Sequence, residues 1–206
     1  MPESPYNPLD KRNLGESVAG ALLGRALGPL PPAEGFSGAG IYAIYYTGAD
    51  ALYAPIAGSG RPIYVGKAVP AGARKGLLGL DLPAGTALFD RLCEHARSVA
   101  QAGLVQGDFR CRYLVADDIW IPLGEALLIA RFQPVWNVVV DGFGNHDPGA
   151  GRRNQQRSRW DTLHPGRSWA ALLASNQRNA DEVAQLVRDF LQGKPVPAAP
   201  PGDDDD

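Results

Sequence analysis

The segment of residues 40–46, with the sequence GIYAIYY, restricts the fold more than any other part of this 206-residue chain. Five of its seven residues are β-branched or aromatic, and such residues favour β-strands. Residues 62–66 (PIYVG) have the same character and predict a second strand, and the alternation over residues 109–115 predicts a third. A long loop is expected between the first two strands, where residues 52–56 are a candidate strand extension.

Helical periodicity occurs on both sides of these strands. Residues 86–102 have an apolar stripe at helical spacing and begin at Thr86, a residue type that favours helix N-caps. Residues 122–132 are strongly apolar, with proline in the first turn and another proline just after the end, which delimits a helix. Further helices are expected over residues 16–27, near 168–175 and near 181–192, and residues 135–140 are expected to be extended.

Composition divides the chain into an N-terminal arm and helix over residues 1–35, one main domain over 36–192 and a Pro-rich acidic tail over 193–206. The first 15 residues are expected to be mobile and the tail to be disordered. Residues 67–85 are rich in Gly and Pro and predict an inserted loop.

No run of 18 apolar residues occurs and the N-terminus lacks the apolar core of a signal peptide, so we expect a cytoplasmic protein without a membrane span. Cys93 and Cys111 match no zinc or redox spacing, and two unpaired, partly buried thiols are expected.

The net charge of −2 hides an uneven distribution. Four of the 22 acidic residues form the terminal run Asp203–Asp206, which leaves 18 acidic against 20 basic residues in the rest of the chain. Five arginines also fall within sixteen residues: Arg152, Arg153, Arg157, Arg159 and Arg167. A nucleic-acid partner is therefore compatible with the charge, because a local basic stripe matters more than the net value.

Glu125 is the only acidic residue of its apolar helical segment (IPLGEALLIARF). A carboxylate on an apolar face is costly unless it is paired or binds a metal. The position alone leaves both explanations open: a metal ligand, or an ion pair with an arginine such as Arg91 or Arg131.

Arg91 and His95 lie four residues apart and therefore share one face of their helix. Arginine suits a phosphate and histidine suits proton transfer near neutral pH, although a solvated helix edge would contain the same residue types. Tyr42 and Tyr64 lie in strands that are able to pair, with Lys67 just after the second. Tyrosine in strands mostly serves packing, and a catalytic tyrosine needs a nearby cation to lower its pKa.

These residues form a recognisable set. The chain contains, in this order, Gly40-Ile41-Tyr42, Tyr64-Val65-Gly66, Arg91, His95, Glu125 and Asn137. Their order and spacing resemble the motifs of the GIY-YIG nuclease superfamily. The segments 45–48 (YYTG), 62–72 (PIYVGKAVPAG), 139–152 (VVDGFGNHDPGAGR) and 164–170 (HPGRSWA) resemble the restriction endonucleases of that superfamily that cut the palindrome CCGCGG.

The resemblance implies an α+β fold, with a small central antiparallel β-sheet flanked by helices, inserted loops and a C-terminal helical extension. It also implies hydrolysis of DNA phosphodiester bonds that leaves a 5′-phosphate and a 3′-hydroxyl. Glu125 is implied to hold one divalent metal ion, Mg²⁺ or Mn²⁺, which needs few carboxylates. Arg91 is implied to stabilise charge on the phosphate.

The resemblance gives the remaining residues supporting roles. Tyr42 is the implied base for the attacking water, directly or through a relay to His95, with Lys67 and Arg91 lowering its pKa. Tyr64 is implied to orient water or phosphate, and Asn137 to position the site. The assignment of the base among Tyr42, Tyr64 and His95 stays open.

DNA recognition is expected outside this set. Arginine reads guanine, and Asn or Gln reads adenine or binds phosphate. The expected DNA contacts are Arg74, Asn145, His146, Arg152, Arg153, Arg157, Arg159, His164 and Arg167. A palindromic target implies a homodimer on double-stranded DNA, and a restriction enzyme implies a methyltransferase that protects the same site. The alternatives are a DNA-binding module with impaired catalysis, a repair or homing nuclease of the same superfamily, and a structural protein with a chance motif.

Overall fold

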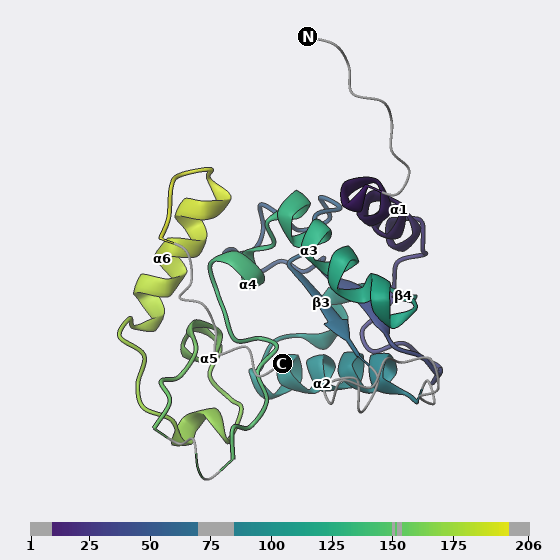
Figure 1. Ribbon diagram of the computed structural model, residues 1–206. Coiled ribbons are helices and arrows are strands. Elements are labelled where there is room, and N and C mark those ends of the chain that lie inside the picture. The colour runs from purple at the N-terminus through teal and green to yellow at the C-terminus, as the bar shows by residue number, and fades with distance from the viewer. Residues whose placement is uncertain (1–9, 70–84, 150, 152–153, 198–206) are drawn as a thin grey trace.

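A computed structural model describes residues 10–69, 85–149, 151 and 154–197 of the chain (Figure 1). Its centre is an antiparallel sheet of four strands that lie in the order β1 (Gly28–Pro29), β4 (Phe109–Val115), β2 (Gly40–Tyr46) and β3 (Tyr64–Ala68). Helices lie against this sheet, so the α+β class predicted from the sequence is confirmed.

The central strand β2 is buried along its whole length. Successive side chains of a strand point to opposite faces, and both faces of β2 are therefore covered. Tyr42, Ile44 and Tyr46 pack with apolar residues of α2 (Ala87–Gln101). Ile41, Ala43 and Tyr45 pack with residues of α1 (Lys11–Leu23) and α3 (Ile121–Phe132). Figure 1 shows the same layers, with α2 on one side of the strands and α1 and α3 on the other.

Glycines allow α1 and α3 to lie close together. A Cβ atom on Gly15 would lie 3.1 Å from the side chain of Leu127, and a Cβ atom on Gly124 would lie 2.7 Å from that of Val18. A larger residue at either position would push the helices apart. This close packing fixes α3, and with it Glu125, against the sheet.

Several predicted boundaries hold. The strands 40–46 and 109–115 have the predicted bounds. α2 is shorter than predicted by one residue at each end, and α3 begins one residue earlier than predicted. Thr86 stands at the N-cap position of α2, but its hydroxyl donates to the Asp90 carboxylate (2.6 Å) instead of capping the backbone. α1 begins earlier than predicted because the Asp10 side chain accepts from the Arg12 backbone N–H and caps it (2.8 Å). The predicted mobile arm is therefore wrong from Lys11 onward, and residues 1–9 lie outside the described residues.

Two predicted extended segments are wrong. Residues 52–56 form turns because the Asp50 side chain accepts from the Leu52 backbone N–H (2.8 Å), which stabilises a turn. Residues 135–140 begin with the short helix α4 (Val135–Val138), which Pro134 precedes in an extended conformation. The strand predicted over 62–66 is shifted, because β3 begins at Tyr64 and extends through Lys67 to Ala68.

The chain continues after α4 into a segment that packs beside the sheet. It contains α5 (Arg159–Leu163), one 3-10 turn η6 (Ala170–Leu172) and α6 (Ala180–Leu191). The helix predicted near 168–175 is thus reduced to a single turn, and α5 was not predicted. Two further 3-10 turns precede β4 and α3: η3 (Gln106–Asp108) and η4 (Asp118–Trp120). The predicted inserted loop lies largely outside the described residues, from 70 to 84.

Both cysteines are unpaired, as predicted, and Cys111 is buried. Among the described residues, none of the helices has the length and apolar character needed to cross a membrane.

Candidate active site

The pairing of β2 with β3 brings Tyr42 and Tyr64 onto one face of the sheet. Tyr42 lies opposite Gly66, and Ile44 lies opposite Tyr64, so the tyrosines are diagonal neighbours with ring centroids 6.2 Å apart. A Cβ atom on Gly66 would lie 2.4 Å from the Tyr42 hydroxyl oxygen. The glycine of the YVG segment therefore makes room for the tyrosine of the GIY segment.

His95 lies on the face of α2 that covers these tyrosines. Its Nε2 atom is 2.6 Å from the Tyr42 hydroxyl oxygen, and both residues are 1% exposed. The ring of Phe143 stacks on the imidazole with centroids 4.4 Å apart. The histidine is therefore fixed from two sides, by a hydrogen bond and by an aromatic ring.

The electrostatic environment keeps both partners of this hydrogen bond uncharged at neutral pH. Burial raises the pKa of Tyr42 well above its usual value, and Tyr64 adds to this, while Arg91 acts in the opposite direction. Burial also lowers the pKa of His95, and the charge of Arg91 lowers it further. At neutral pH the tyrosine is therefore a phenol and the histidine is neutral, and the tautomer of His95 sets which of the two donates in their hydrogen bond.

Arg91 lies one turn before His95 on α2 and is held at three points. Its Nη1 atom is 3.0 Å from a carboxylate oxygen of Glu94 and 2.6 Å from Nε2 of His146, and its Nη2 atom donates to the carbonyl of Gly144. An open pocket of about 190 Å³ adjoins this group, and its lining includes Arg91, His95, Phe143 and His146. The guanidinium is therefore next to a space that an external phosphate is able to enter.

Glu125 forms an ion pair with Lys67 of β3, with 3.1 Å between Oε2 and Nζ. Lys67 was not among the ion-pair partners considered from the sequence. Arg131 instead lies over the ring of Phe132, at 5.2 Å. The Glu125 and Lys67 side chains are 18% and 31% exposed, so solvent and ions reach both. The negative charge of this carboxylate also contributes, in small part, to the raised pKa of Tyr42.

Asn137 of α4 holds the edge strand from the side. Its Oδ1 atom accepts from the Val65 backbone N–H and its Nδ2 atom donates to the Val65 carbonyl, both at 2.8 Å. The amide thus pairs with β3 as a further strand would, and it fixes the segment that carries Tyr64 and Lys67.

A hard divalent cation fits the donors present. Mg²⁺ keeps most of its waters and takes one or two carboxylates, and Glu125 offers one partly exposed carboxylate. Within the described part of the chain, His, Cys, Asp and Glu side chains form no group of three or more with metal-binding geometry. The arrangement therefore fits a cation bound through one carboxylate better than a closed protein cage.

The structure separates the expected DNA contacts into three groups. Arg74, Arg152 and Arg153 lie outside the described residues. Asn145 and His146 line the pocket beside Arg91. The other four side chains bind within the protein: Arg157 donates to Ala170 O, Arg159 to Val139 O, Arg167 pairs with Asp161, and His164 bonds to Tyr53. Each of these four therefore has a partner within the protein, and its contact with DNA stays a prediction.

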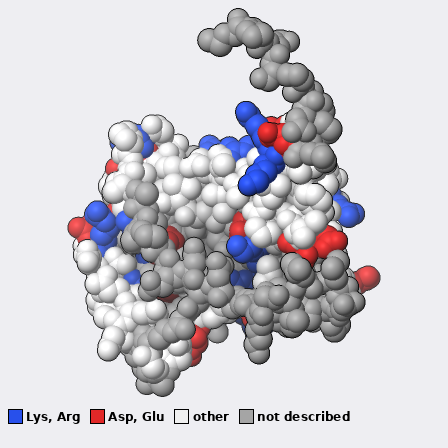
Figure 2. Space-filling model, viewed as in Figure 1, with Lys and Arg blue, Asp and Glu red and all other residues white. Residues whose placement is uncertain are grey.

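Charge on the face of the molecule that Figure 2 shows is mixed. Figure 2 shows Lys and Arg side chains at several places on one face, with Asp and Glu side chains close to them.

The sequence did not identify three groups that contact the site residues. Glu94 and the Gly144 carbonyl bond to Arg91, and Phe143 stacks on His95. The only sequence signal for Phe143 and Gly144 is the GFG run at 142–144. A contact made by a backbone carbonyl cannot be predicted from residue type, because every residue has one.

A sheet of this topology, with Tyr42, His95 and Arg91 on one side and Glu125 at its edge, defines a GIY-YIG nuclease domain. A model of one family, described as the Eco29kI GIY-YIG domain, matches residues 34–191. The chain therefore belongs to the Eco29kI family of GIY-YIG restriction endonucleases, and its domain is that of a nuclease. A search of curated proteins gave no match.

Proposed function

We propose that this chain is a Type II restriction endonuclease that hydrolyses both strands of double-stranded DNA at the palindrome CCGCGG, with one magnesium ion per active site. The buried Tyr42–His95 hydrogen bond next to Arg91 carries the proposal, because it combines a proton acceptor with a phosphate-binding cation. The family match over residues 34–191 supports the class of substrate.

The chain supplies the proton transfers through Tyr42 and His95. As water attacks the phosphorus atom, its proton passes to the Tyr42 oxygen while the Tyr42 proton passes to Nε2 of His95. The neutral state of His95 suits it to receive this proton. Burial and Arg91 oppose the resulting imidazolium, and the negative phosphate offsets part of that cost.

Arg91 is the group that receives the phosphate. Its planar guanidinium matches two phosphate oxygens, and the pocket gives access to it. Glu125 would hold the magnesium ion, and when bound this ion supplies Lewis-acid stabilisation of the leaving 3′-oxygen. Lys67 neutralises Glu125, and Tyr64 lies beside both Tyr42 and His95 and orients the entering groups. The P–O3′ bond breaks and the leaving 3′-oxygen takes a proton from solvent water, so the products are a 5′-phosphate and a 3′-hydroxyl.

A palindrome presents the same bases to two copies related by a two-fold axis, so the active form is a homodimer. Asn145 and His146 are the described candidates for DNA contact, because they line the pocket next to Arg91. Restriction of this kind also requires a methyltransferase that modifies the same sequence in the host.

The test uses the full-length chain and two linear DNA fragments that differ by one base pair within a single CCGCGG site. Double-strand cleavage of the first alone, in magnesium and not in chelator, with 5′-phosphate ends on sequencing, supports the proposal. DNA retardation without cutting identifies a binding module, and cutting of both fragments identifies a nuclease of a different specificity. Light scattering with and without the site tests the dimer, which a monomer under both conditions contradicts.

A further inference from the structure

Arg167 is an unusually enclosed arginine in the segment after the sheet. It is 2% exposed and forms a two-point ion pair with Asp161, with Nε at 2.7 Å from Oδ1 and Nη2 at 2.6 Å from Oδ2. Its guanidinium also lies over the rings of Trp160 and Trp169, with Cζ at 4.6 Å from each centroid. The side chain is therefore held in one place by charge and by two aromatic faces.

The same guanidinium binds the backbone of the segment formed by residues 142–146. Nη1 donates to the carbonyls of Phe143 (3.2 Å) and Asn145 (3.1 Å), and Nη2 donates to that of Gly142 (2.7 Å). Together with the two bonds to Asp161, these use all five N–H donors of an arginine. A lysine, with three donors on one nitrogen, cannot reproduce this planar arrangement.

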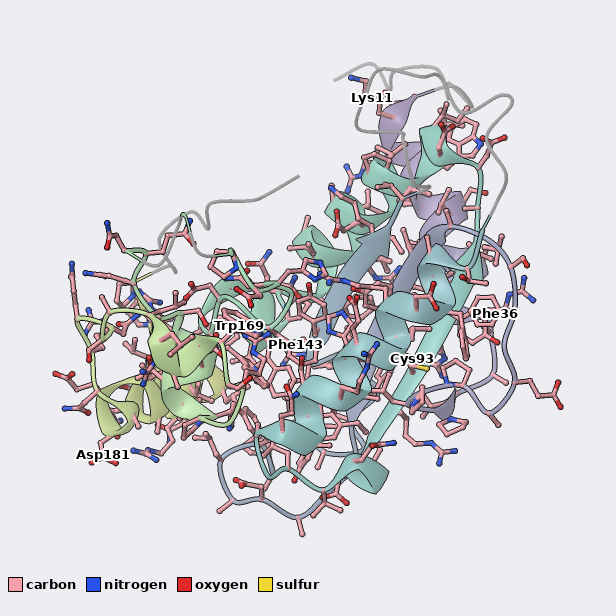
Figure 3. All side chains as sticks on the ribbon, turned by 90° about the horizontal axis from the view of Figure 1, so that it is seen from below. Lys11, Phe36, Cys93, Phe143, Trp169 and Asp181 are labelled. Atoms are coloured by element: carbon pink, nitrogen blue, oxygen red, sulfur yellow. The ribbon has the colours of Figure 1, made fainter. Side chains whose placement is uncertain are left out.

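The 142–146 segment reaches the active site through three neighbouring residues. Phe143 stacks on His95 and meets Tyr64 edge-on, with centroids 5.0 Å apart in the second pair. The Gly144 carbonyl accepts from Arg91, and the His146 ring bonds to the same guanidinium. Figure 3 shows Phe143 and Trp169 at the junction between α2 and the C-terminal helices. Arg167 thus bonds directly to Phe143, which holds His95, and to the carbonyl of Asn145, which lies between Gly144 and His146, the two groups that hold Arg91.

We propose that Arg167 is a positioning residue of the nuclease: it fixes the 142–146 segment and thereby sets the placement of His95 and Arg91. This inference rests on the proposed function and replaces the DNA contact expected for Arg167 from the sequence. It also makes the C-terminal extension part of the active site, because the sheet and α2 alone leave one side of His95 without its stacking partner.

The experiment compares Arg167→Lys and Arg167→Met with Arg112→Met. Arg112 is a matched control, because it also lies over an aromatic ring (Tyr45, 4.9 Å) and donates to a backbone carbonyl (Arg25, 2.9 Å), but on the opposite face of the sheet. Single-turnover cleavage, DNA affinity in chelator and hydrogen exchange over residues 142–147 are measured well below each melting temperature.

Both Arg167 variants are expected to cut about 100-fold more slowly, since small displacements of catalytic groups have effects of this order. DNA affinity should stay near wild type, and exchange should accelerate over 142–147 but not over β2. Added guanidinium ion at low concentration should restore part of the rate of Arg167→Met, with equal sodium chloride as the control. Arg112→Met should cut at nearly the wild-type rate.

Equal slowing of the Arg167 and Arg112 variants at equal loss of melting temperature would overturn the proposal, as would a loss of DNA affinity as large as the loss of rate. If Arg167→Met does not fold, Arg167→Lys decides, and unchanged exchange over 142–147 in that variant counts against the inference. A wild-type chain that cuts no DNA would instead overturn the proposed function, while the exchange data would still report whether Arg167 fixes the segment.

Discussion

The molecule contains two buried tyrosine–histidine pairs with the same hydrogen bond. Tyr42 with His95, and Tyr53 with His164, both have 2.6 Å between the hydroxyl oxygen and Nε2. Burial raises the pKa of both tyrosines and lowers the pKa of both histidines. The pairs therefore cannot be told apart by their geometry or by their protonation states at neutral pH.

Their surroundings differ. Tyr53 accepts a further bond from Nε1 of Trp136 (3.0 Å), and the rings of Trp136 and Trp160 enclose His164. The charge that acts on His164 comes from Asp50, whereas Arg91 acts on His95. A cation and an adjoining pocket thus distinguish the proposed catalytic pair from the one that packs the core. A buried tyrosine–histidine bond is not, by itself, a sign of catalysis.

The largest effect is expected for Glu125, the proposed metal ligand. Glu125→Gln should abolish cleavage and leave DNA binding in chelator equal or tighter, since a negative charge facing the phosphate is removed. Its ion pair with Lys67 is partly exposed, so the free energy of unfolding should fall by only about 1 kcal/mol. Glu16→Gln, which removes an exposed helical glutamate, is the control. Cutting close to wild type, or early melting with lost binding, contradicts the metal-ligand role.

The second prediction compares the replacement of each histidine by glutamine. His95→Gln should slow single-turnover cleavage by about 10²–10⁴-fold, the range for loss of an acid–base group. His164→Gln should leave the rate nearly unchanged, because the amide is able to bond to Tyr53 and no charge is needed there. Rates are compared at saturating DNA and below both melting temperatures. Similar rates in the two variants would remove the distinction between the pairs.

Local features of the sequence predicted much of the sheet and little of what surrounds the site. The strand 40–46 and the helix α3 have strong local signals, in β-branched residues and in flanking prolines, and both were predicted within one residue. The extended structure expected over 135–140 was wrong because Pro134 starts a helix there and Asn137 supplies the pairing with β3. Residue type alone does not distinguish these arrangements.

The motif residues were predictable as a set, but their partners were not. Lys67 meets Glu125 because α3 packs on the sheet where β3 forms its edge, which is a consequence of the topology and not of local sequence. Arg167 and His164 were singled out because basic residues cluster there, and the sequence did not predict that they pair with Asp161 and Tyr53 within the protein. Long-range contacts of this kind leave no periodic signal in one sequence.

The third prediction concerns the stability of the core pair. Tyr53→Phe leaves the Trp136 N–H and His164 without a shared partner, and a buried polar group left unsatisfied costs about 1–3 kcal/mol. The free energy of unfolding in urea should fall by that amount, while the cleavage rate below the melting temperature should hold. Tyr113→Phe, in which the ring stacks on Phe36, serves as the control and should lose less. A slowed reaction in Tyr53→Phe would show that the core pair also takes part in catalysis.

The smallest effect is a difference in how stability depends on pH. Burial lowers the pKa of His164 to about 4, and Asp50 opposes this only in part. The pKa of a histidine in an unfolded chain is about 6.5. Between pH 6.5 and pH 4, about the two pKa values, position 164 is therefore protonated in the unfolded chain and mostly unprotonated in the folded chain. The folded state therefore loses stability as pH falls from about 6.5 to about 4, and the loss due to His164 at pH 4.5 is about 2 kcal/mol. His164→Gln lacks this titrating group. Between pH 7 and pH 4.5 its free energy of unfolding should therefore fall by about 2 kcal/mol less than that of the wild type. His95 contributes equally to both proteins, and the difference isolates the core pair. Parallel curves for the wild type and His164→Gln would mean that His164 titrates normally and is not held neutral by the core.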